Sequence, residues 1–420
     1  MHPNALLELC AELIAAVNKL DAPADATVSA FFRHHKHLGQ RERASLAETV
    51  YALLRERLRF QNLAQSGSGP LNRRLAMLAW RGSDSFLGGA LGPAEKQWLQ
   101  QVQAIDPASL QPRLRHNLPD WLAEPLLARL GEAEFWRLAG VLNEPAPLDL
   151  RVNTLKLKRE EAQAQLQAAG IAAAPTPYSP LGLRIDGKPA LNKLAVFTSG
   201  GVEVQDEGSQ LLALLLAPKR GEMVVDFCAG AGGKTLALGA AMRNTGRLYA
   251  FDVSGHRLDA LKPRLARSGL SNVYPAQIAH ERDERIKRLA GKIDRVLVDA
   301  PCSGLGTLRR NPDLKWRQSP QAVAELQAKQ RAILASAARL VKPGGRLVYA
   351  TCSLLEAENE EVAAEFGAAH PGFRPLPADE ALAKAQVERA GELVENGALR
   401  LWPHRHATDG FFAAAWERAA

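Results

Sequence analysis

The sequence is poor in cysteine, and its few cysteines are widely spread. Only four occur among 420 residues, at Cys10, Cys228, Cys302 and Cys352. No two of them form a CxxC pair, which argues against a disulfide framework and against a clustered zinc site. We therefore expect no bound metal, a reducing compartment, and cysteines that act singly as thiols.

Long hydrophobic runs are missing as well. No apolar stretch approaches the roughly 18 residues that indicate a membrane-spanning helix, and His2, Glu8 and Glu12 interrupt any apolar core of a leader peptide. These absences predict a cytoplasmic protein without a membrane anchor, which we expect to be a monomer. The net charge of +8 indicates a polyanionic partner, most simply nucleic acid, although a merely solvated basic surface would have the same composition.

The chain is too long for one ordinary hydrophobic core, and its texture changes twice. Residues 1–142 carry apolar side chains at helical spacing and predict an all-α domain. Residues 148–210 resemble a small α+β module, with a strand, a turn and a helix in LDLRVNTLKLKREEAQAQLQAAGI, followed by short strands. Residues 211–420 alternate strand and helix patterns, which predicts parallel βαβ units in a doubly wound, Rossmann-like sheet.

Within the last region, five short runs are typical of buried strands: MVVDF, RLYAF, NVYPAQ, DRVLVD and RLVYA. Helical patterns lie between them, over residues 234–242, 255–268 and 322–341. ALRLWP and FFAAAW near the end could form a closing hairpin at one edge. In open α/β sheets, ligands bind outside the carboxyl ends of the strands, so residues that follow these runs are candidates for chemistry.

A glycine loop follows the first of these strands, in VVDFCAGAGGKTLAL. A phosphate-binding P-loop requires glycine where Cys228 stands, which makes a nucleoside triphosphatase improbable. A dinucleotide-binding fingerprint requires a third glycine near Thr235, and none is present. The remaining interpretation is the nucleoside-binding loop of a Rossmann-like methyltransferase.

That interpretation explains the glycines and a later acid together. Gly230, Gly232 and Gly233 allow the backbone to approach a cofactor closely. An acid that ends the next strand then accepts hydrogen bonds from the ribose hydroxyls, and Asp252 lies at that place, 19 residues past Gly233.

Two further strands end beside a thiol. RVLVDAPCSGLGT places Asp299 and Cys302 after one strand, and YATCS places Cys352 after another. A thiolate that adds to carbon 6 of a pyrimidine makes carbon 5 nucleophilic enough to accept a methyl group from a sulfonium donor. An acid must protonate or hydrogen-bond the ring as charge builds. The alternative is that both cysteines are small buried hydrophobic residues.

The same residues carry a family resemblance. DAPCSGLGTLRRNPDLKW together with ATCSLLEAENEE resembles the paired signature of the RsmB/NOP family of RNA cytosine-5 methyltransferases. The resemblance extends from about residue 148 to the end of the chain through LRVNTLK, VQDEGSQL, DFCAGAGGK and PHRHATDGFFAA. LGQRERASLAETVYALLRERL is similar to the NusB-like helical RNA-binding domain of this family.

The resemblance implies a class I, Rossmann-like methyltransferase domain that follows an all-α NusB-like domain and the α+β module. It implies methyl transfer from S-adenosylmethionine to carbon 5 of a cytosine in RNA, most simply ribosomal RNA, through a covalent cysteine adduct at carbon 6. Cys352 is the nucleophile by resemblance, Cys302 assists release of the product, and Asp299 joins them in catalysis. The residues that match the family's cofactor contacts are Cys228, Ala229, Gly230, Ala231, Gly232, Gly233, Lys234, Asp252 and Asp299.

Two kinds of contact are less defined by the sequence. The run PAQIAHERDER has no acid before Glu281 where family members often carry one near the adenine, so Ile278 or Ala279 would contact the adenine by packing or through backbone. Basic and aromatic residues that follow Cys302 are candidates for RNA binding, with a packing role as the alternative for the tryptophan. These candidates are Arg309, Arg310, Lys315 and Trp316.

Other functions stay open at this point. The same chemistry could methylate transfer RNA, and a related chemistry acts on uracil or on DNA. A non-catalytic RNA-binding assembly factor could also retain a methyltransferase scaffold, but it would not need both the cofactor loop and Cys352.

Overall fold

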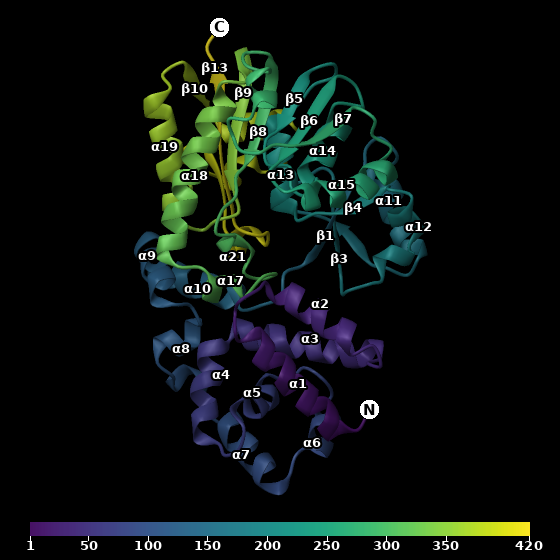
Figure 1. Cartoon of the computed structure of the whole chain (residues 1–420), viewed down its shortest axis with the longest axis vertical. Helices are drawn as coiled ribbons and strands as arrows, with labels where there is room; N and C mark the ends of the chain where they lie inside the picture. The colour runs from purple at the N-terminus through teal and green to yellow at the C-terminus, as the bar shows by residue number, and fades with distance from the viewer. The chain divides into compact units, whose positions relative to one another are not determined.

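The computed structural model describes residues 1–420, and the chain forms two compact units (Figure 1). The helical unit comprises Met1–Pro145 together with Thr307–Pro320, and the α/β unit comprises Ala146–Gly306 together with Gln321–Ala420. None of the helices combines the length and the apolar composition that crossing a membrane requires.

The helical unit is built around its first helix. α1 buries Leu6, Leu13 and Ile14 at helical spacing against neighbours that include α3, α5 and α6. This confirms the all-α prediction for the N-terminal region. The helices of this unit are α1 (Pro3–Val17), α2 (Ala24–His34), α3 (Gln40–Arg55), α4 (Arg57–Leu63), α5 (Leu71–Ala79), α6 (Asp84–Ala90), α7 (Pro93–Gln103), α8 (Pro112–His116), α9 (Asp120–Leu130), α10 (Glu132–Leu142) and α17 (Leu314–Arg317).

A distant segment completes the helical unit. Thr307–Pro320, which contains α17, follows Cys302 in sequence but packs among the N-terminal helices. The Asp313 carboxylate accepts a hydrogen bond from the Ala24 backbone N–H at 3.1 Å, in the first turn of α2. The sequence pattern did not predict this insertion, because residues 307–320 lie far from α2 along the chain.

The α/β unit begins with a small antiparallel sheet, in the order β2-β3-β1-β4. Its apolar face includes Leu150, Val152 and Leu183, which pack with Leu166 of the covering helix. This confirms the predicted α+β module. Its elements are β1 (Leu148–Val152), α11 (Arg159–Ala168), β2 (Ala173–Pro175), β3 (Gly182–Ile185), α12 (Ala195–Thr198) and β4 (Val202–Val204).

The main sheet has the order β11-β12-β13-β9-β8-β5-β6-β7, with β10 paired to β13. Strands β9, β8, β5, β6 and β7 are parallel, whereas β13 returns antiparallel to β9 and pairs with β12 as the predicted closing hairpin. The Rossmann-like prediction is therefore confirmed. The strands are β5 (Met223–Asp226), β6 (Arg247–Asp252), β7 (Val273–Gln277), β8 (Ile293–Asp299), β9 (Val341–Thr351), β10 (Phe373–Leu376), β11 (Val394–Glu395), β12 (Ala398–Leu401) and β13 (Phe411–Arg418).

Helices lie between these strands as the alternation predicted. One boundary differs, because Val341 belongs to β9 and pairs with Ile293 instead of ending the preceding helix. The helices are α13 (Glu207–Leu216), α14 (Gly233–Ala241), α15 (Gly255–Ser268), α16 (Glu284–Lys287), α18 (Pro320–Ala338), α19 (Glu360–Ala369), α20 (Ala378–Lys384) and α21 (Pro403–His406). The division between the α+β module and the sheet domain near residue 210 stays a prediction.

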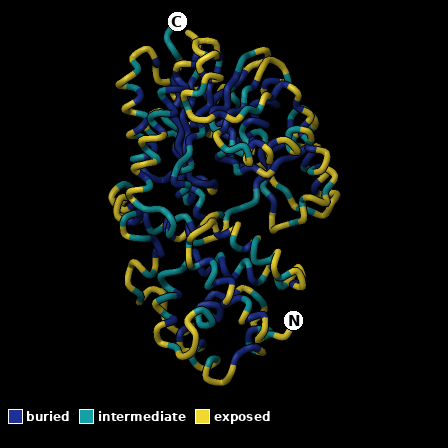
Figure 2. Tube along the Cα trace, in the orientation of Figure 1, coloured by how far each residue is buried: buried dark blue, intermediate teal, exposed yellow.

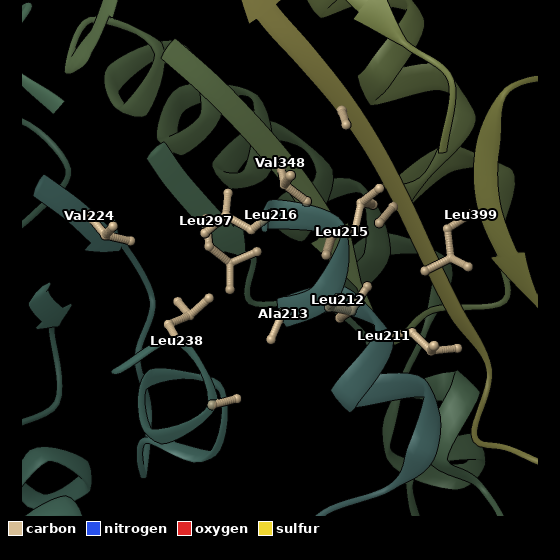
Figure 3. Close-up of a cluster of buried hydrophobic side chains, with 14 of the residues drawn as sticks. Leu211, Leu212, Ala213, Leu215, Leu216, Val224, Leu238, Leu297, Val348 and Leu399 are labelled. Atoms are coloured by element: carbon tan, nitrogen blue, oxygen red, sulfur yellow. The ribbon is translucent and has the colours of Figure 1, made fainter. Parts of the chain in front are cut away.

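The core of the α/β unit lies between α13 and the sheet (Figure 3). Leucines along α13 meet Val224 of β5, Leu297 of β8 and Val348 of β9, all fully buried. Buried backbone is concentrated in the central strands of this unit (Figure 2). The rigid core fixes the carboxyl ends of β5, β6, β8 and β9, where the candidate site is built.

Candidate active site

The carboxyl ends of four adjacent parallel strands bring the predicted site residues to one edge of the sheet. Asp226 ends β5, Asp252 ends β6 and Asp299 ends β8, while Cys352 follows β9 directly. Strand order reverses at β5, which lies between β6 and β8, and this is the place where open α/β sheets bind ligands.

The glycine loop joins β5 to α14 in a conformation that needs glycine. Gly230 and Gly232 have φ angles of +56° and +83°, which side-chain-bearing residues rarely adopt. A Cβ atom on Gly232 would approach Leu261 Cδ1 to 2.1 Å. A Cβ on Gly230 would meet no atom within 4 Å, so this part of the loop faces open space.

Asp252 holds the glycine loop and the start of the next helix together. Its carboxylate accepts hydrogen bonds from the Gly230 N–H at 2.8 Å and from the Ser254 N–H at 2.7 Å. The side chain is nearly buried, with 6% of the residue exposed. An open glycine cradle beside an ordered carboxylate fits a nucleoside cofactor with ribose hydroxyl donors.

The α+β module supports the same loop, which the sequence did not indicate. Arg264 of α15 donates to the Ala231 carbonyl at 2.6 Å and forms an ion pair with Glu203 of β4 at 3.1 Å. Glu203 also pairs with Arg267. These residues are at least 25 positions from the loop, so no local motif signals their contact.

A buried acid lies under the loop. Burial raises the pKa of Asp226 to about 7, although a hydrogen bond of 2.7 Å from the Thr235 hydroxyl acts in the opposite direction. Burial also raises the pKa of the Cys228 thiol well above its ordinary value. Cys228 therefore stays protonated and contributes packing instead of a nucleophile.

Lys234 and Asp299 form an ion pair beside the thiols, with Nζ and Oδ2 2.7 Å apart. Burial alone would lower the pKa of the Lys234 ammonium, but the Asp299 carboxylate, helped by Cys352 and Asp226, raises it. Lys234 therefore stays charged. The Asp299 side chain is 27% exposed, which leaves it accessible to a substrate.

Cys302 and Cys352 face each other, with their sulfur atoms 3.3 Å apart. Both are partly exposed free thiols. The hydrogen bond to Cys352 and burial raise the pKa of Cys302 well above its ordinary value, so Cys302 keeps its proton and can donate it to the Cys352 sulfur. The Gly306 N–H also donates to the Cys352 carbonyl at 2.8 Å, which ties the two cysteine loops together.

An open hollow of about 550 Å³ follows β7, where the sequence left the adenine contact undefined. Gln277, Ile278 and Ala279 line one side, and Asp283 and Arg285 line another. The Asp283 carboxylate accepts a hydrogen bond from the Ala279 N–H at 3.0 Å. A carboxylate thus reaches this place from beyond Glu281, although the adenine contact itself stays a prediction.

All four RNA-binding candidates lie in the Thr307–Pro320 segment of the helical unit. Lys315 is 1% exposed, and its ammonium donates to the Arg55 carbonyl at 2.7 Å and to Asn143 Oδ1 at 3.1 Å. Burial lowers the pKa of Lys315 to about 7. This position differs from the sequence expectation, because a side chain so enclosed does not present its charge to RNA.

Trp316 has the packing role that the sequence left open. Its indole N–H donates to the Leu54 carbonyl at 2.7 Å, and its ring packs against the core of the helical unit. Arg309 is buried and donates to the Pro145 carbonyl at 2.9 Å. Arg310 is partly exposed, and its contact with RNA stays a prediction.

Comparison with known proteins places these features in a wider context. The family model described as 16S rRNA methyltransferase RsmB/F matches residues 213–417, and the model of the RsmF/B-like ferredoxin-like domain matches residues 118–192. The chain is 36% identical over 342 residues to the probable ribosomal RNA small subunit methyltransferase B of Synechocystis sp., covering 81% of this chain and 75% of that protein.

Solved structures agree with this match. The crystal structure of PH0851 has a TM-score of 0.78 and 28% identity, covering 100% of this chain and 99% of that chain. A methyltransferase homologue from Pyrococcus horikoshii has a TM-score of 0.63 and 30% identity, covering 75% of this chain and 100% of that chain. The similarity to PH0851 therefore includes the helical region as well as the sheet.

Proposed function

Because the chain belongs to the RsmB/F family of 16S rRNA methyltransferases, we propose that it methylates carbon 5 of a cytosine in ribosomal RNA, with Cys352 as the covalent nucleophile. The observation that carries this proposal is the pair of thiols 3.3 Å apart at the ends of two adjacent strands. The Lys234–Asp299 ion pair and the glycine loop lie at the same edge of the sheet.

Carbon 5 of cytosine is a poor nucleophile, and addition of a thiolate to carbon 6 makes it more reactive. The Cys352 thiol loses its proton, and the resulting thiolate bonds to carbon 6 while ring nitrogen 3 takes up a proton. The ring becomes enamine-like and carbon 5 becomes nucleophilic. S-adenosylmethionine supplies the methyl group, carried on a positively charged sulfur. After transfer, a base removes the carbon 5 proton, the bond between carbon 6 and sulfur breaks, and Cys352 is released.

The neighbours of Cys352 fit the remaining steps. The Asp299 carboxylate can accept a hydrogen bond from a ring N–H of the attacked cytosine, and Lys234 keeps this carboxylate oriented. Cys302 is placed to assist elimination, because its thiol lies 3.3 Å from the Cys352 sulfur and can hydrogen-bond that sulfur as it leaves carbon 6. The glycine loop, Gly230–Gly233, and Asp252 would hold the cofactor.

The target base must leave its stack to reach Cys352, which favours a single-stranded loop or a flipped cytosine. The net charge of +8 supports an RNA partner, since phosphate contacts supply most of the affinity for nucleic acid. Methylation of ribosomal RNA is favoured over transfer RNA by the family to which the chain belongs.

Bisulfite sequencing tests this proposal directly. A cytosine of 16S ribosomal RNA should resist conversion in cells that contain the protein and be converted in cells that lack it. Restoring the wild-type gene should restore the resistance, whereas a Cys352→Ala gene should not. Identical conversion of ribosomal RNA with and without the protein would overturn the proposal, and a difference confined to transfer RNA would reassign the substrate.

Cofactor binding has its own expected outcome. Asp252→Ala should weaken S-adenosylmethionine binding by about 1.5–3 kcal/mol, the effect of a lost charge-assisted hydrogen bond, which corresponds to roughly 10-fold to 150-fold in Kd. Isothermal calorimetry measures this change. Asp259→Ala is the matched control, because Asp259 is an exposed acid on α15 that pairs with Lys262. Equal affinity of the two variants would remove Asp252 from the cofactor site.

A further inference from the structure

A single buried carboxylate lies behind both cysteine loops. Glu358 has no exposed surface, and its Oε2 atom accepts hydrogen bonds from the Ser303 hydroxyl at 2.5 Å and from the Ser353 hydroxyl at 2.5 Å. These serines directly follow Cys302 and Cys352, and their hydroxyl oxygens are 3.2 Å apart. The two serine hydroxyls therefore lie next to each other, as the two cysteine thiols do.

The second oxygen of Glu358 secures the Cys302 loop. Oε1 accepts a hydrogen bond from the Ser303 N–H at 2.8 Å and another from the Gln330 side-chain amide at 3.0 Å. The same Gln330 amide donates to the Pro301 carbonyl at 3.0 Å. The residues on both sides of Cys302 are thus held, directly or through Gln330, by one carboxylate.

The Cys352 loop is secured in the same way by the next residue along the chain. The Asn359 side chain accepts from the Thr351 hydroxyl and donates to the Ser353 carbonyl at 3.0 Å. Thr351 and Ser353 flank Cys352. Because Glu358 and Asn359 are adjacent, the two cysteine loops share one anchor.

Burying a carboxylate is costly unless its oxygens are satisfied, and the donors to Glu358 are neutral hydroxyl and amide groups. An apolar side chain here would take the acceptor away from the buried Ser303, Ser353 and Gln330 donors, so the position requires a hydrogen-bond acceptor. The carboxylate accepts four hydrogen bonds, two from Ser303, one from Ser353 and one from Gln330 of α18. The Glu358 carboxylate is therefore placed to fix the distance between the two cysteine loops.

We propose that Glu358 is a positioning residue that sets the spacing of the two thiols. The hydrogen bond that Glu358 accepts from Ser353, here called the Ser353 arm, orients Cys352 for attack on carbon 6. The hydrogen bonds that it accepts from Ser303, the Ser303 arm, orient Cys302 for product release. This inference rests on the proposed function, because it assigns the two arms to two steps of the covalent reaction.

The serine variants separate the two arms. With unmethylated 16S ribosomal RNA transcript and S-adenosylmethionine, Ser353→Ala should slow formation of the covalent adduct by about 10-fold to 100-fold, the effect of a small displacement of a reacting group. Ser303→Ala should form the adduct at close to the wild-type rate and release it slowly, so that adduct accumulates. Denaturing electrophoresis over a time course measures both steps, and thermal melting reports whether each variant is folded.

Glu358→Gln tests the anchor itself without RNA. Phenylarsine oxide bridges two neighbouring thiols with loss of one water molecule, so its binding reports the spacing between Cys302 and Cys352. Glu358→Gln replaces one acceptor oxygen by a donor and should weaken this bridging at least tenfold, whereas Glu356→Gln, an exposed acid on the same short helical turn, should not.

The outcomes distinguish this inference from the proposed function. Absence of adduct from both Cys302→Ala and Cys352→Ala would reject the covalent mechanism and with it the assignment of the arms. Suppose instead that Cys302→Ala forms the adduct normally. Serine variants that slow neither step, or that lose only thermal stability, would then reject the positioning role of Glu358 and leave the covalent mechanism intact. Unchanged arsenical binding in a folded Glu358→Gln variant would also reject it, whatever the RNA reaction shows.

Discussion

Replacing Cys352 with alanine should abolish methyl transfer and leave no covalent complex, whereas replacing Cys302 with alanine should trap protein and RNA together. The reason is that, in the proposed mechanism, the two sulfurs act at different steps. Without Cys352, no atom is present to attack carbon 6. Without Cys302, attack and methyl transfer proceed, but elimination stalls and Cys352 stays bonded to the base.

The geometry explains why two such similar residues should behave so differently. Their sulfur atoms are 3.3 Å apart, so both reach the same part of a bound base. The hydrogen bond to Cys352 and burial raise the pKa of Cys302, which favours the thiol form of Cys302. Position at a strand end does not by itself assign the roles, and the Thr-Cys-Ser match to the family favours Cys352 as the nucleophile.

Denaturing gel electrophoresis with labelled RNA measures the trapped species. The double variant should show no adduct, and Cys10→Ala should behave as wild type, because Cys10 is buried in the helical unit. An adduct from Cys352→Ala and none from Cys302→Ala would exchange the two roles. Adducts from neither single variant would leave the covalent mechanism without support.

A second large effect is expected from Gly306→Ala. Gly306 lies where the two cysteine loops meet, and a Cβ atom there would approach the Gly410 carbonyl oxygen to 2.0 Å and the Cys352 carbonyl oxygen to 2.8 Å. These are backbone atoms, so no flexible side chain can move aside. The loops must separate, which breaks the hydrogen bond between the Gly306 N–H and the Cys352 carbonyl.

We expect Gly306→Ala to lower the free energy of unfolding by about 3 kcal/mol, the upper end for overpacking, and to lower the methylation rate by about 100-fold or more, as a displaced nucleophile would. Urea unfolding and single-turnover methylation measure the two effects. Gly367→Ala is the control, because Gly367 lies in α19 with open space around it, and alanine there should be neutral or slightly stabilising. Equal activity of the two variants would contradict the proposed contact between the loops.

The sequence predicted those parts of the structure that depend on a local pattern of residues. Alternating strand and helix runs predicted the sheet, since hydrophobic periodicity reflects which face of an element is buried. The glycine loop and Asp252 were predictable because a tight approach of backbone to a cofactor demands glycine at fixed spacing. Both thiols were predictable because each follows a buried strand.

Contacts between distant residues were not predictable in the same way. Glu358 is one of several acids in the run LLEAENEE, and nothing in that run shows which of them lies behind Cys302. Lys315 and Trp316 follow the Pro-Cys-Ser-Gly motif and carry a charge and an aromatic ring, which suggested RNA contact, but tertiary packing buries the lysine. Asp283 reaches the Ala279 backbone only because the chain turns back after β7.

The insertion of Thr307–Pro320 into the helical unit also constrains the order in which the chain can fold during synthesis. Carbonyl and N–H groups of the N-terminal helices, including those of Leu54 and Ala24, receive their partners from this segment. Roughly 175 residues separate the end of the N-terminal helices from the end of the segment, which takes about 9–35 seconds to translate at the usual rates. The N-terminal helices are therefore made well before the segment that completes their unit, and the surface that this segment covers stays exposed until residue 320 has been synthesised.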